Sequence, residues 1–141
     1  MRFAIVVSRY NQNITQGLLD GALSVFKKSK IDWNSVKVVW VPGTFEIPLA
    51  AKKLALSHKY KAVIALGCIL KGETSHNHYI ALAASLGLMN ISLETGIPVS
   101  FGILTPNNLK QALARSRIGS ANKGVEAAEA AIEMAELIGN P

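Results

Sequence analysis

Residues 62–76 read AVIALGCILKGETSH, an apolar run that ends in a polar turn flanked by glycines. The run from Ala62 to Leu70 has the composition of a buried strand, and the turn carries His76 to the predicted start of a helix. A second segment, VPGTFEIP at residues 41–48, also leads from an apolar run into a helix. In open α/β sheets, ligands bind at the carboxyl ends of strands, where such turns gather. The two turns together therefore predict a site with an aromatic side chain, a carboxylate and a histidine.

Size and composition indicate one globular domain, which we expect to span residues 1–141. Half of the 141 residues are hydrophobic and 17% are charged, so the chain is long and apolar enough to bury a core. No apolar run reaches membrane-spanning length, and the N-terminus does not read as a signal peptide. The lone cysteine, Cys68, excludes a disulfide within the chain and fits a reducing compartment. We therefore expect a cytoplasmic protein.

The net charge of +6 raises the question of nucleic-acid binding. The lysines are scattered, and those near residues 27–30 fall at a predicted helix end, where they complement the helix dipole. No basic run is interleaved with aromatic residues, as stacking on a nucleic-acid strand would require. The pattern favours small anionic molecules over nucleic acid as ligands.

Apolar periodicity predicts the element order β-α-β-α-β-α-β-α-α. We expect strands at residues 3–7, 36–41, 62–70 and 99–104. Because each strand is almost continuously apolar and alternates with helices, the sheet is expected to be parallel and covered on both faces. The predicted fold is therefore a single-domain, three-layer α/β structure with a four-stranded parallel sheet.

The helix boundaries follow from capping residues and helix breakers. Asn13 and Gln16 resemble a capping box, and Thr44 is a predicted cap for a helix that tolerates Pro48 in its first turn. A long helix is expected at about residues 76–95, stopped by the Gly96-Ile97-Pro98 sequence. Two more helices are expected to end near residues 117 and 138, the first capped by Asn107 or Asn108 and the second by Ser120 or Asn122.

His76 is the first candidate for chemistry. At a helix N-terminus the dipole disfavours the imidazolium ion, which leaves a neutral base able to take a proton. The alternative is a histidine that satisfies hydrogen bonds of the loop. His76 and His78 could also form a metal pair, but no third ligand lies nearby in the sequence. Glu46 could bind a polyhydroxy ligand, complement the dipole of its own helix, or do both.

Aromatic and cationic residues supply further candidates. Phe45 and Phe101 are core residues by default, whereas Tyr10 follows a strand end and could stack on a flat heterocycle. The turn at residues 72–74 could offer backbone N–H groups to an anion, and Arg115 and Lys123 could add charge. Alternatively, Arg115 complements a helix C-terminus and Lys123 is a solvated surface charge. Neither the P-loop nor the dinucleotide-binding glycine pattern is present.

Six motifs in register resemble the lumazine synthase family of riboflavin biosynthesis, over about residues 5–137. They are Arg9-Tyr10-Asn11 and residues 41–48, 67–76, 93–99, 101–102 and 122–124. The resemblance implies a flavodoxin-like fold and a transferase without metal or organic cofactor. It implies condensation of 5-amino-6-(D-ribitylamino)uracil with 3,4-dihydroxy-2-butanone 4-phosphate to 6,7-dimethyl-8-ribityllumazine, with release of phosphate and water.

The resemblance also implies roles for individual residues. His76 would transfer protons, Lys123 would be a supporting charge, and Arg115 of a neighbouring subunit would bind phosphate together with the backbone amides of Glu73 and Thr74. Phe101 would close the pocket across a subunit boundary. The remaining implied substrate-binding residues surround the pyrimidine and the ribityl chain: Tyr10, Asn11, Thr44, Phe45, Glu46, Cys68, Ile69 and Leu70.

Family members form pentamers, some of which stack into icosahedral shells of sixty subunits. We expect a homopentamer, lean slightly to the shell, and note riboflavin synthase as a possible enclosed cargo. Asn77 and His78 depart from the family pattern, in which an aromatic residue and an acid usually follow the histidine. This change leaves an alternative open, a non-catalytic relative that binds flavin or lumazine or only forms a shell.

Overall fold

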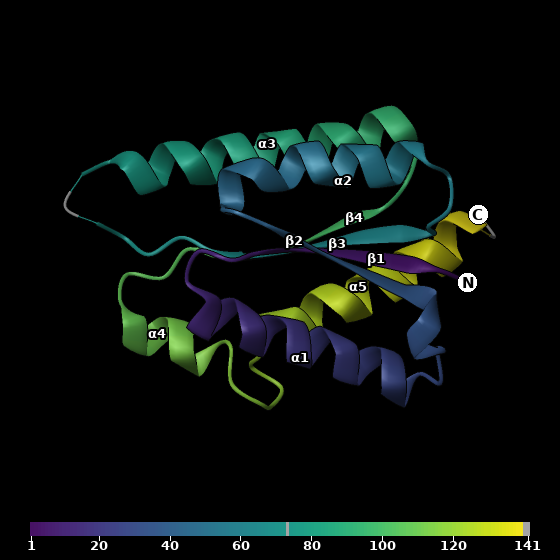
Figure 1. Ribbon diagram of the computed structural model, residues 1–141, viewed down its shortest axis with the longest axis horizontal. Coiled ribbons are helices and arrows are strands. Elements are labelled where there is room, and N and C mark those ends of the chain that lie inside the picture. Colours follow the sequence, from purple (N-terminus) through teal and green to yellow (C-terminus); the bar gives the residue numbers. More distant parts are fainter. Residues whose placement is uncertain (73, 140–141) are drawn as a thin grey trace.

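A four-stranded parallel sheet lies between two layers of helices (Figure 1). The computed structural model describes residues 1–72 and 74–139. The strands are β1 (Phe3–Ser8), β2 (Val36–Val41), β3 (Ala62–Cys68) and β4 (Val99–Leu104), in the order β2-β1-β3-β4. All three neighbouring pairs are parallel. This order is that of the first four strands of a flavodoxin-like sheet, so the predicted fold class is confirmed.

Each face of the sheet carries its own hydrophobic core. On one face, α1 (Gln12–Lys28) and α5 (Lys123–Gly139) pack over a core that includes Phe3, Ile5 and Val7, and α4 (Leu109–Ala114) lies at the end of this layer (Figure 1). On the other face, α2 (Ile47–Leu56) and α3 (His76–Thr95) pack over a core that includes Ala4 and Val6. Successive side chains of a strand point to opposite faces, so β1 is buried along its whole length.

Two predicted helix caps are wrong. Helix α1 already begins at Gln12, with Asn11 in the left-handed conformation (φ 61°) before it, so Asn13 lies inside the first turn. Gln16 donates instead to Asp20 Oδ1 at 3.0 Å, which leaves no capping box. Thr44 opens the 3₁₀ turn η2 (Thr44–Glu46) rather than a helix, and α2 starts only at Ile47, with proline in its first turn as predicted.

The other boundaries lie close to the predicted ones. Strand β3 ends at Cys68 rather than Leu70, because its last partner on β4 is Leu104. Of the alternative caps, Asn108 Oδ1 accepts from Gln111 N at 2.9 Å, and Asn122 Oδ1 accepts from Gly124 N at 2.8 Å. Helix α4 ends three residues before the predicted 117, and α5 ends one residue after the predicted 138. A further 3₁₀ turn, η1 (Trp33–Ser35), precedes β2.

Among the described residues, no helix is long and apolar enough to cross a membrane.

Candidate active site

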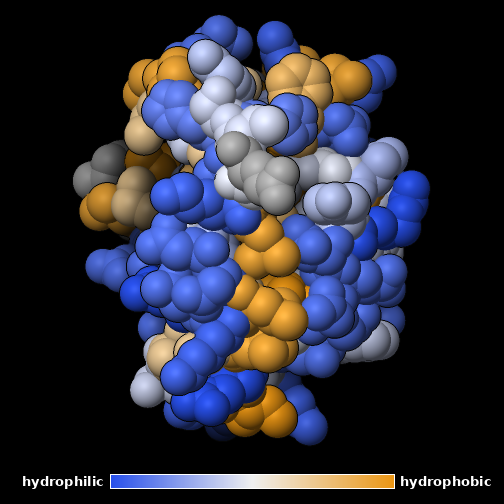
Figure 2. Space-filling model, turned by 90° about the vertical axis from the view of Figure 1, so that its left-hand side faces the viewer, coloured by the Kyte–Doolittle hydropathy of each residue, from blue (hydrophilic) through white to orange (hydrophobic). Residues whose placement is uncertain are grey.

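A pocket of about 1000 Å³ lies where the carboxyl ends of β1, β2 and β3 meet the start of α3. At this end of the molecule, apolar side chains form a band between hydrophilic ones (Figure 2). The pocket collects predicted site residues from three segments that are far apart in the sequence, at residues 10–11, 44–46 and 68–76. They are Tyr10, Asn11, Thr44, Phe45, Glu46, Cys68, Ile69, Leu70, Thr74 and His76.

Backbone and side-chain hydrogen bonds hold the loop after β1 against its neighbours. Arg9 N donates to Val41 O at 2.8 Å, and Tyr10 N donates to Pro42 O at 3.0 Å, which places Tyr10 beside the turn after β2. On the other side, Asn11 Nδ2 donates to Cys68 O at 3.0 Å. The loop is thus fastened to the ends of both strands that flank β1.

Exposed aromatic side chains line the pocket, among them Tyr10 and Phe45. Tyr10 is 73% exposed although it follows the buried strand β1, and Phe45, after the partly buried strand β2, is 63% exposed. The default interpretation of Phe45 as a core residue is therefore wrong, because η2 turns its side chain outward. Exposed aromatic rings at a pocket are suited to stacking on a flat ligand.

The inner part of the pocket is apolar and largely buried. Cys68 and Ile69 are buried, and Ile69 N donates to Leu104 O at 2.8 Å, which extends the tie between β3 and β4 past the end of the ladder. Burial raises the pKa of the Cys68 thiol from 9.0 to about 11. The thiol is therefore neutral near pH 7 and shapes the pocket rather than acting as a nucleophile.

His76 is the first residue of α3 and is exposed at the pocket. Its backbone N–H donates to Thr74 Oγ1 at 3.3 Å. Tyr79 also lines the pocket and was missed by the sequence analysis, although residues three apart on a helix share a face. His78 is not part of the lining, and its ring lies edge-on to Tyr79 with the centroids 5.7 Å apart. Within residues 1–72 and 74–139, no three His, Cys, Asp or Glu side chains gather as a metal site.

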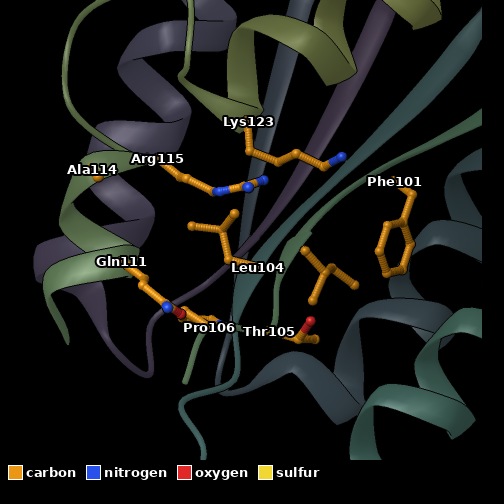
Figure 3. A pocket seen from close by; sticks show the side chains of 9 residues that line it. Phe101, Leu104, Thr105, Pro106, Gln111, Ala114, Arg115 and Lys123 are labelled. Atoms are coloured by element: carbon orange, nitrogen blue, oxygen red, sulfur yellow. The ribbon is translucent and has the colours of Figure 1, made fainter. Parts of the chain in front are cut away.

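Three further predicted residues, Phe101, Arg115 and Lys123, line a second pocket of about 540 Å³ at the carboxyl end of β4. Arg115 and Lys123 extend toward the side of this pocket where the ring of Phe101 lies (Figure 3). Phe101 is 40% exposed, so its side chain is not a core residue. Lys123 is not simply a solvated charge, because its Nζ lies 3.1 Å from Glu126 Oε1. Gln111, which sequence reasoning did not single out, also lines this pocket.

A single chain thus divides the predicted residues between two pockets. The first holds the aromatic rings, the carboxylate and the histidine, and the second holds two cations and a phenyl ring. Glu73, which was predicted to bind phosphate through its backbone, lies outside the described residues.

The fold and the first pocket define an α/β protein with a large pocket at the carboxyl ends of parallel strands, the place where proteins of this class bind small molecules. A model of the 6,7-dimethyl-8-ribityllumazine synthase family matches residues 1–139, and the chain therefore belongs to this family. The family comprises enzymes of riboflavin biosynthesis that act on small molecules and assemble as oligomers. The match confirms the resemblance found in the sequence.

Proposed function

We propose that the chain is a transferase that condenses 5-amino-6-(D-ribitylamino)uracil with 3,4-dihydroxy-2-butanone 4-phosphate to 6,7-dimethyl-8-ribityllumazine, phosphate and water. One observation carries the proposal: in a member of this family, residues from three distant segments converge on one large pocket. The pocket offers an aromatic, partly apolar surface for a heterocycle and polar groups for its substituents.

The uracil substrate would occupy the first pocket. The ring of Tyr10 would stack on the pyrimidine, and Glu46 would accept hydrogen bonds from the ribityl hydroxyls. Backbone groups of residues 68–70 would bind the pyrimidine edge, which explains why apolar side chains are sufficient there. Asn11, Thr44 and Phe45 line the same pocket and would complete the contact with this substrate.

The chemistry requires proton transfer more than a nucleophile. The 5-amino group would attack the ketone, and loss of water would give a Schiff base. Elimination of phosphate would leave a carbonyl group, and attack of the 6-amino nitrogen on it, with loss of a second water, would close the ring of the lumazine. His76 is the first residue of α3 and lines the pocket, where it would accept and donate the protons that these steps transfer. Because both substrates are already reactive, most of the acceleration would come from holding them together.

The phosphate would be bound where two copies of the chain meet. We propose that Arg115, Lys123 and Phe101 of a neighbouring subunit close the first pocket, with Thr74 and Glu73 contributing backbone amides. Two observations support this arrangement. The two groups of residues lie in separate pockets of one chain, and α3 presents an exposed apolar row beside the first pocket: Tyr79, Leu82, Leu86, Met89 and Leu93.

We further propose a homopentamer, in which each copy supplies its own first pocket and closes the first pocket of a neighbour with its Phe101, Arg115 and Lys123. Stacking of pentamers into an icosahedral shell, and enclosure of riboflavin synthase as cargo, stay predictions. The size of the purified particle, measured by light scattering, tests whether a shell forms. The size of the particle formed with added riboflavin synthase tests whether cargo is enclosed.

The function is tested by mixing purified protein with both substrates and following lumazine fluorescence against the slow uncatalysed reaction. We expect an acceleration that requires His76. Substrate binding without acceleration would contradict the proposal and would favour a non-catalytic relative. Asn77 would then be the first residue to examine, because it departs from the family pattern and lines the pocket.

A further inference from the structure

Asn122 is a buried side chain at the meeting point of three segments. It is 1% exposed, and its amide nitrogen Nδ2 lies within hydrogen-bond distance of three backbone oxygens: Gly17 O at 3.0 Å, Ser116 O at 3.0 Å and Arg117 O at 3.1 Å. Its oxygen Oδ1 accepts from Gly124 N at 2.8 Å and from Val125 N at 3.2 Å. Helix capping needs only the oxygen, so capping leaves the three donor contacts unexplained.

The contacts of both amide atoms fasten the backbone next to the two cations of the second pocket: the nitrogen binds the segment after Arg115, and the oxygen binds the segment after Lys123. Ser116 and Arg117 directly follow Arg115, whereas Gly124 directly follows Lys123. Lys123 N also donates to Arg115 O at 2.8 Å. The two cations of the pocket are therefore joined through their own backbone and through the neighbouring amide of Asn122.

Helix α1 packs directly against Ser116 and Asn122 through its glycines. A methyl group added at Gly17 would overlap the carbonyl oxygen of Ser116, and one at Gly21 would overlap the amide of Asn122. The absence of side chains at these two positions lets α1 approach the turn closely enough for Gly17 O to accept a hydrogen bond. Asparagine suits the position because its amide both donates and accepts, whereas a serine or aspartate cannot donate to several carbonyls.

We infer that Asn122 is a positioning residue that holds Arg115 and Lys123 in the geometry of an anion site. The inference rests on the proposed function, in which these cations bind the phosphate of the second substrate. Errors of about 1 Å in the placement of a binding group can cost on the order of a hundredfold in rate, so a rigid backbone beneath the two cations matters. Asn122 acts only through them, because neither pocket includes it among its lining residues.

The test separates the two roles of the amide with Asn122→Ser, which keeps an oxygen to cap α5 but replaces the two N–H donors of the amide by a single O–H on a shorter side chain. We expect the KM for the butanone phosphate, and the Kd for inorganic phosphate, to rise about tenfold, with the KM for the uracil substrate within about twofold of wild type. Ser120→Ala, on the exposed part of the same turn, is the matched control and should leave both constants unchanged. Asn122→Asp is a second variant, in which a carboxylate faces the three carbonyls.

A double-mutant cycle distinguishes positioning from general destabilisation. In an Arg115→Ala background, Asn122→Ser should weaken phosphate binding by less than about twofold, because the group that it positions is already gone. An equal loss in both backgrounds, or unchanged phosphate affinity in the single variant, would overturn the inference.

The same measurements separate this inference from the proposed function. Wild-type protein that makes no lumazine, yet binds inorganic phosphate through Arg115 and loses that binding in Asn122→Ser, would overturn the function and leave the positioning role intact. Lumazine synthesis by the wild type, together with unchanged phosphate binding in Asn122→Ser, would support the proposed function and overturn the positioning role. A wild type that neither turns over nor binds phosphate would overturn both.

Discussion

His76 and His78 lie two residues apart on the first turn of α3, but their surroundings differ. His76 lines the large pocket, whereas His78 is exposed outside it and packs edge-on against Tyr79. Successive residues on a helix point about 100° apart, so a spacing of two places the rings on different sides. The two histidines can therefore be compared by substitution: replacing His76 changes the pocket, whereas replacing His78 changes the same helix turn outside the pocket.

His76→Ala is expected to lower the rate of lumazine formation about tenfold to a hundredfold, since a positioned acid–base group is lost while substrate positioning remains. His78→Ala is the matched control and should keep at least about half of the wild-type rate. Both side chains are exposed, so unfolding midpoints should change little. Equal rates for wild type and His76→Ala would exclude the proton-transfer role.

Cys68 gives a prediction on pH dependence. Burial raises the pKa of its thiol from 9.0 to about 11, so between these pH values the folded chain holds a proton that the unfolded chain releases. The free energy of unfolding should therefore fall as pH rises from about 9 to about 11, and the side chain should have no such effect below pH 9. Cys68→Ala should remove this part of the pH dependence, as urea titrations at several pH values would measure.

The reactivity of the same thiol provides an independent check. In the folded protein, the rate of reaction with a disulfide reagent should rise with a midpoint near pH 11, whereas urea-unfolded chains should show a midpoint near 9. A folded-state midpoint near 9 would mean that the thiol is in contact with water.

At the scale of elements, α1 and α5 pack in close backbone contact. A methyl group added at Gly124 would overlap the backbone oxygen of Leu18, so the first turn of α5 packs directly against the backbone of α1. Over the sheet, α5 contributes small side chains, with Ala127, Ala128 and Ala131 buried. Small residues bring the helix close to the strands, and so bring Lys123, at the start of α5, over the end of β4.

Gly124→Ala is expected to lower the free energy of unfolding by about 1–3 kcal/mol, because overpacking against a rigid backbone outweighs the better helix propensity of alanine. Gly139→Ala, in the same helix, is the control, since no atom lies within 4 Å of the added methyl group. The control should be neutral or stabilising by less than about 1 kcal/mol. Urea denaturation of both variants measures the difference, and a stable Gly124→Ala protein would show that α1 and α5 can move apart freely.

At the scale of the whole molecule, the division of the site residues between two pockets has the largest consequence. Within one chain, His76 belongs to the first pocket and Arg115 to the second, and the two linings share no residue. In a ring of copies, each copy could present one pocket to one neighbour and the other pocket to the next. The activity of the assembly would then depend on pairs of chains rather than on each chain alone.

Mixed assemblies test this dependence. When His76→Ala and Arg115→Ala chains are co-expressed in equal amounts, random assembly should restore intact sites to about a quarter of the total, because each site would take one residue from each of two copies. Lumazine formation should then be well above that of either variant alone. Chains that are purified separately and mixed without exchange are the control. Activity no higher than the sum of the two variants would place both residues in the same chain's site.

The amino-acid sequence by itself determined the order of strands and helices, the parallel sheet and the family. These follow from local patterns: continuous apolar runs such as residues 62–68, glycine and proline breaks, and short motifs that carry their own spacing. Where local signals competed, the prediction failed. Asn13 and Thr44 were both expected to cap helices, but the chain path set by the preceding strands moved each helix start away from them.

Only the tertiary structure decided which residues meet. The register of β1, β2 and β3 brings Tyr10, Phe45 and His76 to one pocket, and the packing of α4 and α5 sends Arg115 and Lys123 to another. The three donor contacts of Asn122, one of them with a residue 105 positions away, likewise have no signature in the sequence. The physical reason is that a pattern of neighbouring residues sets the local conformation, whereas a site depends on contacts between segments that only the packed core brings together.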